Sequence, residues 1–95
     1  MKRPCVYILA SRRNGTLHVG VTSDLIQRVG PHKERLVDGF TRRYGVRRLV
    51  WCEAHESMAS AIRREKEIKD WKRRWKLALI EEHNSTWREK YEDLL

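Results

Sequence analysis

Two short β-like runs joined by an Asn-Gly turn open the chain and constrain its fold more than any other feature. The runs cover residues 5–11 and 16–22, and Asn14-Gly15 lies between them. An Asn-Gly pair between two such apolar runs is the strongest short-range signal for a β-hairpin. The sequence therefore predicts a fold built on an antiparallel hairpin.

The hairpin would also bring particular side chains together. With a loop of two or four residues, odd positions of the first strand pair with even positions of the second. Tyr7 then shares a sheet face with His18 and Gly20. We expect these residues to form the floor of a small active site, in which a phenol and an imidazole lie beside the space left by the glycine.

One further strand and several helices follow the hairpin. The predicted order is strands at 4–11 and 16–22, a helix at 24–36, a basic loop at 37–46, a strand at 47–53, and helices at 57–71, 73–83 and 86–93. The third strand must return to the hairpin, because a two-stranded sheet is only marginally stable. We expect one α+β domain over residues 1–95, with a small three-stranded antiparallel sheet flanked by helices.

Glu65 differs from the other carboxylates because it falls on the apolar side of a predicted helix. Ser57 is the expected N-cap of that helix. Its apolar stripe comprises Met58, Ala61, Ile62, Ile68 and Trp71. A carboxylate that points inward needs a metal ion or an arginine as partner, because burying an isolated charge is costly. Glu67 lies on the wet side, where Arg63 and Arg64 precede it by four and three residues.

Arg28 and His32 are four residues apart on the first predicted helix and share a face. Pro31 lies between them and is expected to kink the helix, because its ring clashes with the carbonyl of Gln27. A surface pair of Arg28 with Asp24 is the alternative for the arginine. Tyr7 and His18 could likewise be satisfied core residues, and Asn84 a plain helix C-cap.

The ordered series of motifs resembles that of the GIY-YIG nucleases, most closely their small stand-alone bacterial (UPF0213-like) members, over nearly the whole chain. The segments that carry the resemblance are Val6-Tyr7-Ile8, His18-Val19-Gly20, Thr22-x-x-Leu25-x-x-Arg28-x-x-x-His32, Phe40-Thr41-Arg42-Arg43-Tyr44, Ala61-x-x-x-Glu65-x-x-Ile68 and Leu79-Ile80-Glu81-x-x-Asn84. Two positions depart from the family pattern. Cys5 replaces the glycine of the first motif, and His18 replaces the tyrosine of the second.

The resemblance implies a divalent-metal-dependent endonuclease that hydrolyses phosphodiester bonds in DNA. Its catalytic residues would be Tyr7, His18, Arg28, His32, Glu65 and Asn84. Glu65 would hold Mg²⁺ or Mn²⁺, for which a carboxylate and water are suitable ligands. His18 could serve as the base, because an imidazole with a pKa near ~6.5 accepts a proton at neutral pH better than a phenol near ~10.

The charge of the chain favours a polyanionic partner, since the net charge is +8 over 95 residues. The residues expected to contact nucleic acid are Arg42, Arg43, Tyr44, Lys69, Lys72 and Arg73. A merely solvated cationic face is the alternative. Trp71, Trp75 and Leu79 recur every four residues, which indicates core packing more than a platform for base stacking.

No apolar run is long enough to span a membrane, and Met1-Lys2-Arg3-Pro4 does not resemble the start of a signal peptide. Cys5 and Cys52 are expected to be reduced core thiols of a cytoplasmic protein. The sequence leaves open whether the substrate is single-stranded, branched or duplex DNA, or RNA, and it leaves the oligomeric state open. A catalytically weak nucleic-acid-binding module is the main alternative function, and a protein-interaction domain is a third.

Overall fold

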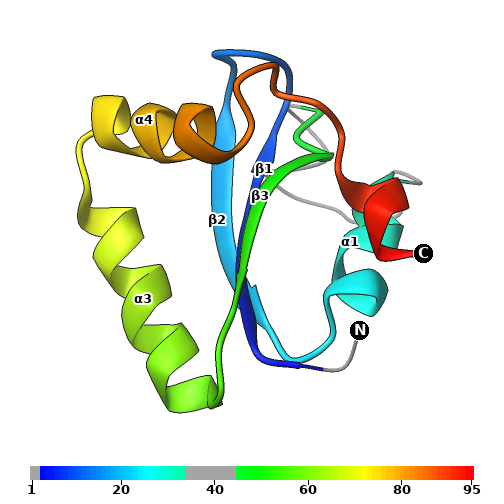
Figure 1. Cartoon of the computed structure of the whole chain (residues 1–95), viewed down its shortest axis with the longest axis vertical. Coiled ribbons are helices and arrows are strands. Elements are labelled where there is room, and N and C mark those ends of the chain that lie inside the picture. The colour runs from blue at the N-terminus through cyan, green and yellow to red at the C-terminus, as the bar shows by residue number, and fades with distance from the viewer. Residues whose placement is uncertain (1–2, 34–44) are drawn as a thin grey trace.

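The computed structural model describes residues 3–33 and 45–95, without the side chains of residues 31–33. Three antiparallel strands form one sheet in the order β2-β1-β3 (Figure 1). The strands are β1 (Cys5–Ala10), β2 (Leu17–Thr22) and β3 (Arg48–Ala54). β3 pairs with β1, which confirms the predicted return of the third strand and the α+β class.

The β1–β2 hairpin has the predicted register. Tyr7 lies opposite Gly20, and Leu9 lies opposite His18. At the turn, the Gly15 N–H donates to the Arg12 carbonyl at 2.9 Å, and Asn14 has a φ of 57°. Asparagine tolerates this left-handed conformation better than most residues, which explains its place in the turn.

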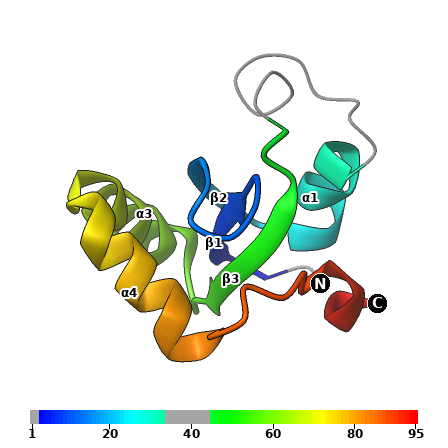
Figure 2. The same ribbon diagram turned by 90° about the horizontal axis from the view of Figure 1, so that it is seen from above.

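Helices cover both faces of the sheet (Figures 1 and 2). On one face lie α3 (Met58–Asp70) and α4 (Arg73–His83), which pack on Val6, Ile8 and Ala10 through residues such as Ala61, Ile68 and Ile80. On the other face lie α1 (Leu25–Lys33) and the 3₁₀ helix η1 (Tyr91–Leu94). There Cys5, Tyr7 and Leu9 pack with Leu25 and Val29. β1 is therefore the central strand and is buried along its whole length.

The helix boundaries agree with the prediction for α3 and α4. Ser57 caps α3, and its hydroxyl accepts the Ser60 N–H. α1 continues through Gly30-Pro31 to Lys33. The rest of the predicted helix to residue 36, and most of the basic loop predicted at 37–46, lie outside the described residues.

The prediction of a last helix over residues 86–93 is mostly wrong. Only Tyr91–Leu94 is helical, as a 3₁₀ turn. Trp87 has a φ of 58°, which ends any helix there, and its side chain is fully buried. Its indole N–H donates to Glu81. The burial of this one large ring thus overrides the local helical pattern. In the part of the chain that the structure describes, no helix is both long and apolar enough to cross a membrane.

Candidate active site

The ring of Tyr7 lies directly over Gly20 on the face of the sheet that α1 covers. A methyl group on residue 20 would come within 2.4 Å of both Cζ and the hydroxyl oxygen of Tyr7. Real Cβ atoms do not approach other atoms so closely, so only glycine leaves room for this ring. Tyr7 is fully buried. The space left by the glycine, predicted as part of the site's floor, is therefore filled by the phenol.

Arg28 and His18 both lie close to this phenol. The Nε atom of Arg28 donates to the Tyr7 hydroxyl at 3.2 Å, while the arginine side chain as a whole is exposed. The ring centroids of Tyr7 and His18 are 6.2 Å apart, with the planes tilted by 51°. His18 is half-buried. The described contact of the Asp24 carboxylate is with the Gln27 N–H at the start of α1, and that of the Arg28 side chain is with Tyr7.

Glu65 lies on α3, whose buried residues pack on the opposite face of the sheet from Tyr7. Its side chain is only 13% exposed, which confirms that it points inward. Its described partner is Lys69, one turn along the same helix, at 2.9 Å. An arginine was one expected kind of partner, and the described contact of the Arg28 side chain is with Tyr7.

The apolar stripe predicted for α3 needs a correction. Met58 is 36% exposed and Ile62 is 38% exposed, so neither belongs to the core. The buried side of the helix follows Ala61 and Ile68, with Glu65 between them. The helix is thus rotated by part of a turn from the expected phase, and Glu65 remains on the inner side.

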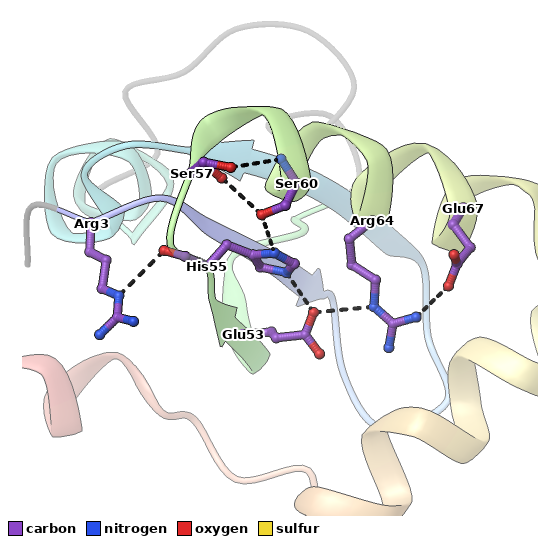
Figure 3. A network of polar contacts seen from close by, with 7 residues as sticks. All are labelled: Arg3, Glu53, His55, Ser57, Ser60, Arg64 and Glu67. Carbon is purple, nitrogen blue, oxygen red and sulfur yellow. Dashed lines mark hydrogen bonds and ion pairs between the residues drawn. The ribbon is translucent and has the colours of Figure 1, made fainter.

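A network of polar contacts fixes α3 against the end of β3 (Figure 3). His55 bridges Glu53, at 2.7 Å from Nε2, and the hydroxyl of Ser60, at 2.9 Å from Nδ1. Arg64 donates to the same Glu53 oxygen at 3.1 Å. Arg64 also contacts Glu67, as the predicted position of Glu67 on the solvent side of the helix implies. Arg64 precedes Glu65 in the chain, so the network ties α3 to β3 next to the position of the Glu65 carboxylate. The sequence analysis did not find it, because its members come from a strand, a turn and a helix.

Glu65 is the candidate metal ligand, although its described partner is the ammonium group of Lys69. The described residues contain no group of three or more His, Cys, Asp or Glu side chains that could enclose a metal. Mg²⁺ in phosphoryl-transfer sites keeps several waters and takes only one or two carboxylates, the remaining ligands being substrate phosphate oxygens. A single inward carboxylate fits this pattern. Lys69, which is 51% exposed, would have to release it.

Asn84 lies at the C-cap of α4, where it joins separate segments. Its side-chain amide donates to the carbonyls of Val50, at 3.0 Å, and Arg88, at 2.9 Å, and its oxygen accepts the Arg88 N–H. These bonds hold the end of α4 against β3, which matches the C-cap alternative. His32 lies in the last turn of α1, and its side chain is outside the described part of the structure.

The cationic residues expected to bind nucleic acid lie in different surroundings. Lys69 pairs with Glu65, and Lys72 precedes α4 as its exposed N-cap residue. Arg73 reaches back to the hairpin and donates to the carbonyls of Asn14 and Gly15 at 2.8 and 2.6 Å. Arg42, Arg43 and Tyr44 lie outside the described residues.

The contact of Arg73 with the hairpin creates a pocket that sequence analysis missed. It has a volume of about 440 Å³ and is lined by Ser11, Arg12, Asn14, Gly15, Thr16 and Arg73. No local pattern could reveal it, because Arg73 and Asn14 are far apart in the chain. Two guanidinium groups among hydroxyls and turn backbone make a surface that suits a phosphate group.

Both cysteines are free thiols near the Tyr7 face. Cys52 lies opposite Tyr7 in the β1–β3 register. Burial raises the pKa of the Cys5 thiol and, likewise, that of Cys52. Both side chains therefore remain protonated at neutral pH and are poor nucleophiles.

Comparisons with known proteins show the family to which the chain belongs. Residues 3–78 match the model of the GIY-YIG catalytic domain. The chain is 34% identical to the UPF0213 protein SH2523 of Staphylococcus haemolyticus over 82 residues, which span 86% of this chain and 99% of that protein. The solution NMR structure of the UPF0213 protein BH0048 from Bacillus halodurans is similar with a TM-score of 0.58 and 31% identity, over 93% of each chain. These matches indicate a nuclease-type function, and hence a nucleic-acid substrate. This chain belongs to the GIY-YIG family, among its small UPF0213 members.

Proposed function

We propose that the protein is a divalent-metal-dependent endonuclease that hydrolyses phosphodiester bonds in DNA. The observation that carries this proposal is the grouping of Tyr7, His18 and Arg28 over Gly20 on one face of the sheet. An acid–base group, a hydroxyl and a fixed cation are the side chains that a phosphodiester hydrolase needs around its nucleophile.

The different burial of the three groups suggests how they would divide the work. His18 is half-buried and would accept the proton of the attacking water. Tyr7 is fully buried, and its oxygen accepts a hydrogen bond from Arg28. Its own O–H would then donate outward and hold the water or the imidazole in place. The exposed side of Arg28 would face the phosphate, where its charge would stabilise the oxygens that become more negative.

Glu65 would hold the ion, and His32 and Asn84 would complete the site. Mg²⁺ or Mn²⁺, when bound, would neutralise the scissile phosphate and stabilise the leaving oxygen. α3 packs against β1 and the edge strand β2, the strand that carries His18. A phosphate lying across this edge would therefore lie between Glu65 and His18. His32 would help to orient the nucleophile, and Asn84 would keep α4 and β3 together.

A single-stranded or branched DNA is the substrate that we favour, with RNA as the alternative. A chain of 95 residues offers little surface for reading bases in a duplex groove. The cationic groups at the hairpin would contact the phosphate backbone, which carries no sequence information. We assign the protein to the cytoplasm, where Cys5 and Cys52 stay reduced.

A catalytically weak nucleic-acid-binding module is the second candidate. The pair between Glu65 and Lys69 favours it, because a carboxylate already neutralised by a lysine is a poorer metal ligand. His18, which replaces the tyrosine of the second motif, also favours a binding module.

A cleavage screen separates the two candidates. Purified protein would be incubated with labelled single-stranded, duplex and branched DNA, and with RNA, in Mg²⁺, in Mn²⁺ and in excess EDTA. The endonuclease predicts internal cuts that require the metal. Binding to these oligonucleotides without cleavage under any metal condition would support the binding module instead.

A further inference from the structure

An aromatic pocket runs along α4 from the C-cap of α3, apart from the Tyr7 face. It has a volume of about 350 Å³ and is lined by Trp71, Trp75, Ala78, Leu79 and Glu82. This volume is at the small end of the range of about 300–1,000 Å³ for ligand pockets. Both helices belong to the layer on the opposite face from α1 (Figure 2).

The two tryptophans are arranged so that the ring of Trp75 remains available for stacking with a ligand. Trp71 is half-buried, with the Arg64 guanidinium 5.2 Å from its ring centroid. Trp75 meets Trp71 edge to face, with centroids 6.3 Å apart and an interplanar angle of 78°. Trp75 is 49% exposed, which makes the expected core packing wrong for this residue. A large ring that is held in place by its neighbours and still half open to solvent can stack against a planar ligand.

The charges around the pocket select the kind of ligand. The first turn of α4 and the residue before it present Lys72, Arg73 and Arg74, all exposed. The net charge of the chain is +8, so its surface attracts polyanionic ligands and repels cationic ligands. Inside the pocket, however, the Glu82 carboxylate would repel a phosphate. The occupant should therefore be an uncharged planar group that is attached to a polyanion.

We infer that this pocket binds an unpaired nucleobase of a single-stranded nucleic acid, which stacks on Trp75 while Lys72 and Arg74 contact the flanking phosphates. Stacking on exposed aromatic rings beside a cationic surface is how proteins bind single strands without reading their sequence. A base inside a duplex cannot enter, because both its faces are already stacked. The inference rests on the proposed nucleic-acid substrate and adds that the strand is single at this position.

The test compares variants by fluorescence anisotropy with labelled single-stranded and duplex oligonucleotides of the same length, in EDTA so that no cleavage occurs. Trp75→Ala should weaken single-strand binding about 5- to 150-fold, as expected for the loss of one stacked base. Trp75→Phe should keep most of the affinity, and duplex binding should be the same for all three proteins. Ile62→Ala is the matched control, since it removes an exposed apolar side chain of α3 outside the pocket and should have no effect.

Tryptophan fluorescence gives a second readout. Trp51 and Trp87 are buried, so quenching by a bound oligonucleotide should come from the pocket. Wild-type protein should be quenched, and Trp75→Phe should lose most of this quenching while it still binds. Equal single-strand affinity of wild type and Trp75→Ala would overturn the inference. So would a dimer in sedimentation that Trp75→Ala dissociates with no change in affinity, because the pocket would then be a surface between two copies.

These outcomes are distinct from those of the cleavage screen. Metal-dependent cleavage with an unchanged Trp75→Ala affinity would leave the proposed nuclease intact and remove only the base pocket. A loss of single-strand affinity in Trp75→Ala without any cleavage would keep the pocket and favour the binding module.

Discussion

Tyr7 and Gly20 fit each other across the first two strands, since the phenol lies in the space that a side chain at position 20 would need. The same phenol receives the hydrogen bond of Arg28, so the glycine determines where two of the proposed catalytic groups lie. In this protein Gly20 of the second motif contributes to the site by leaving room for the ring of Tyr7, which faces it on β1.

Gly20→Ala should therefore damage both stability and activity. Its methyl group must displace a fully buried ring, and such overpacking typically lowers the free energy of unfolding by about 1–3 kcal/mol. Urea unfolding measures this loss, and cleavage assays under folding conditions measure the effect on activity. Gly30→Ala is the control, because its methyl group meets only the Tyr91 hydroxyl at 3.4 Å, within a helix that alanine favours. Equal stability of the two variants would contradict this account of the site.

The pH dependence of cleavage should report the base. If His18 accepts the proton, its neutral form is active. The rate should then rise with pH as the imidazole loses its proton and level off before a phenol ionises. His18→Tyr, which restores the family's residue, should keep activity and move the rising limb to higher pH. His18→Phe with an unchanged rate and profile would show that His18 is not the base.

The cationic groups should control the salt dependence of binding. Replacing Lys72 and Arg73 together by alanine, or Arg42 and Arg43 together, should weaken nucleic-acid binding. Each lost phosphate contact should lower the slope of log affinity against log salt by about one. Arg63 and Lys66 provide a matched control, because both are exposed on α3 and neither lines the pocket that Arg73 forms with the hairpin turn. The Tm of each variant must be measured too, since Arg73 also holds the hairpin. Equal slopes in wild type and both test pairs would place the binding surface elsewhere.

Stability should fall at alkaline pH because of the two thiols. Burial raises the pKa of Cys5 above its ordinary value of 9.0, and burial does the same to Cys52. As pH rises above 9.0, the unfolded chain loses these protons before the folded one does, so the free energy of unfolding decreases. Below that pH the contribution of both thiols is fully present. Cys52→Ala should show a shallower decrease than wild type in urea unfolding across this range, and identical pH slopes would contradict it.

Much of the fold follows from local rules of the sequence. The Asn-Gly turn and the period-two pairing predicted the hairpin, its register and the shared face of Tyr7, His18 and Gly20. Ser57 predicted the start of α3. These features depend on residues that are close in sequence or on a single pair of strands, so local sequence patterns are enough to predict them.

Contacts between distant segments could not be predicted in the same way. The amide of Asn84 bonds to the Val50 carbonyl of another element, and Trp87 takes up a left-handed backbone to bury its ring. Which side of α3 is buried depends on how Ala61 and Ile68 pack on the sheet, and the apolar pattern of the helix alone does not determine this packing. The open ring of Trp75 has the same origin, because Trp71 ends one helix and Trp75 belongs to the next.

The most direct test of the proposed nuclease compares Glu65→Ala with Glu67→Ala in Mg²⁺-dependent cleavage of a single-stranded oligonucleotide. The two carboxylates lie on the same helix, but Glu65 is 13% exposed and Glu67 is 56% exposed and paired with Arg64. Glu65→Ala should abolish cleavage and leave oligonucleotide binding in EDTA unchanged, because it removes a metal ligand and no phosphate contact. Glu67→Ala should cleave at close to the wild-type rate. Cleavage that survives Glu65→Ala, or is lost only in Glu67→Ala, would contradict the assignment of the metal site to Glu65.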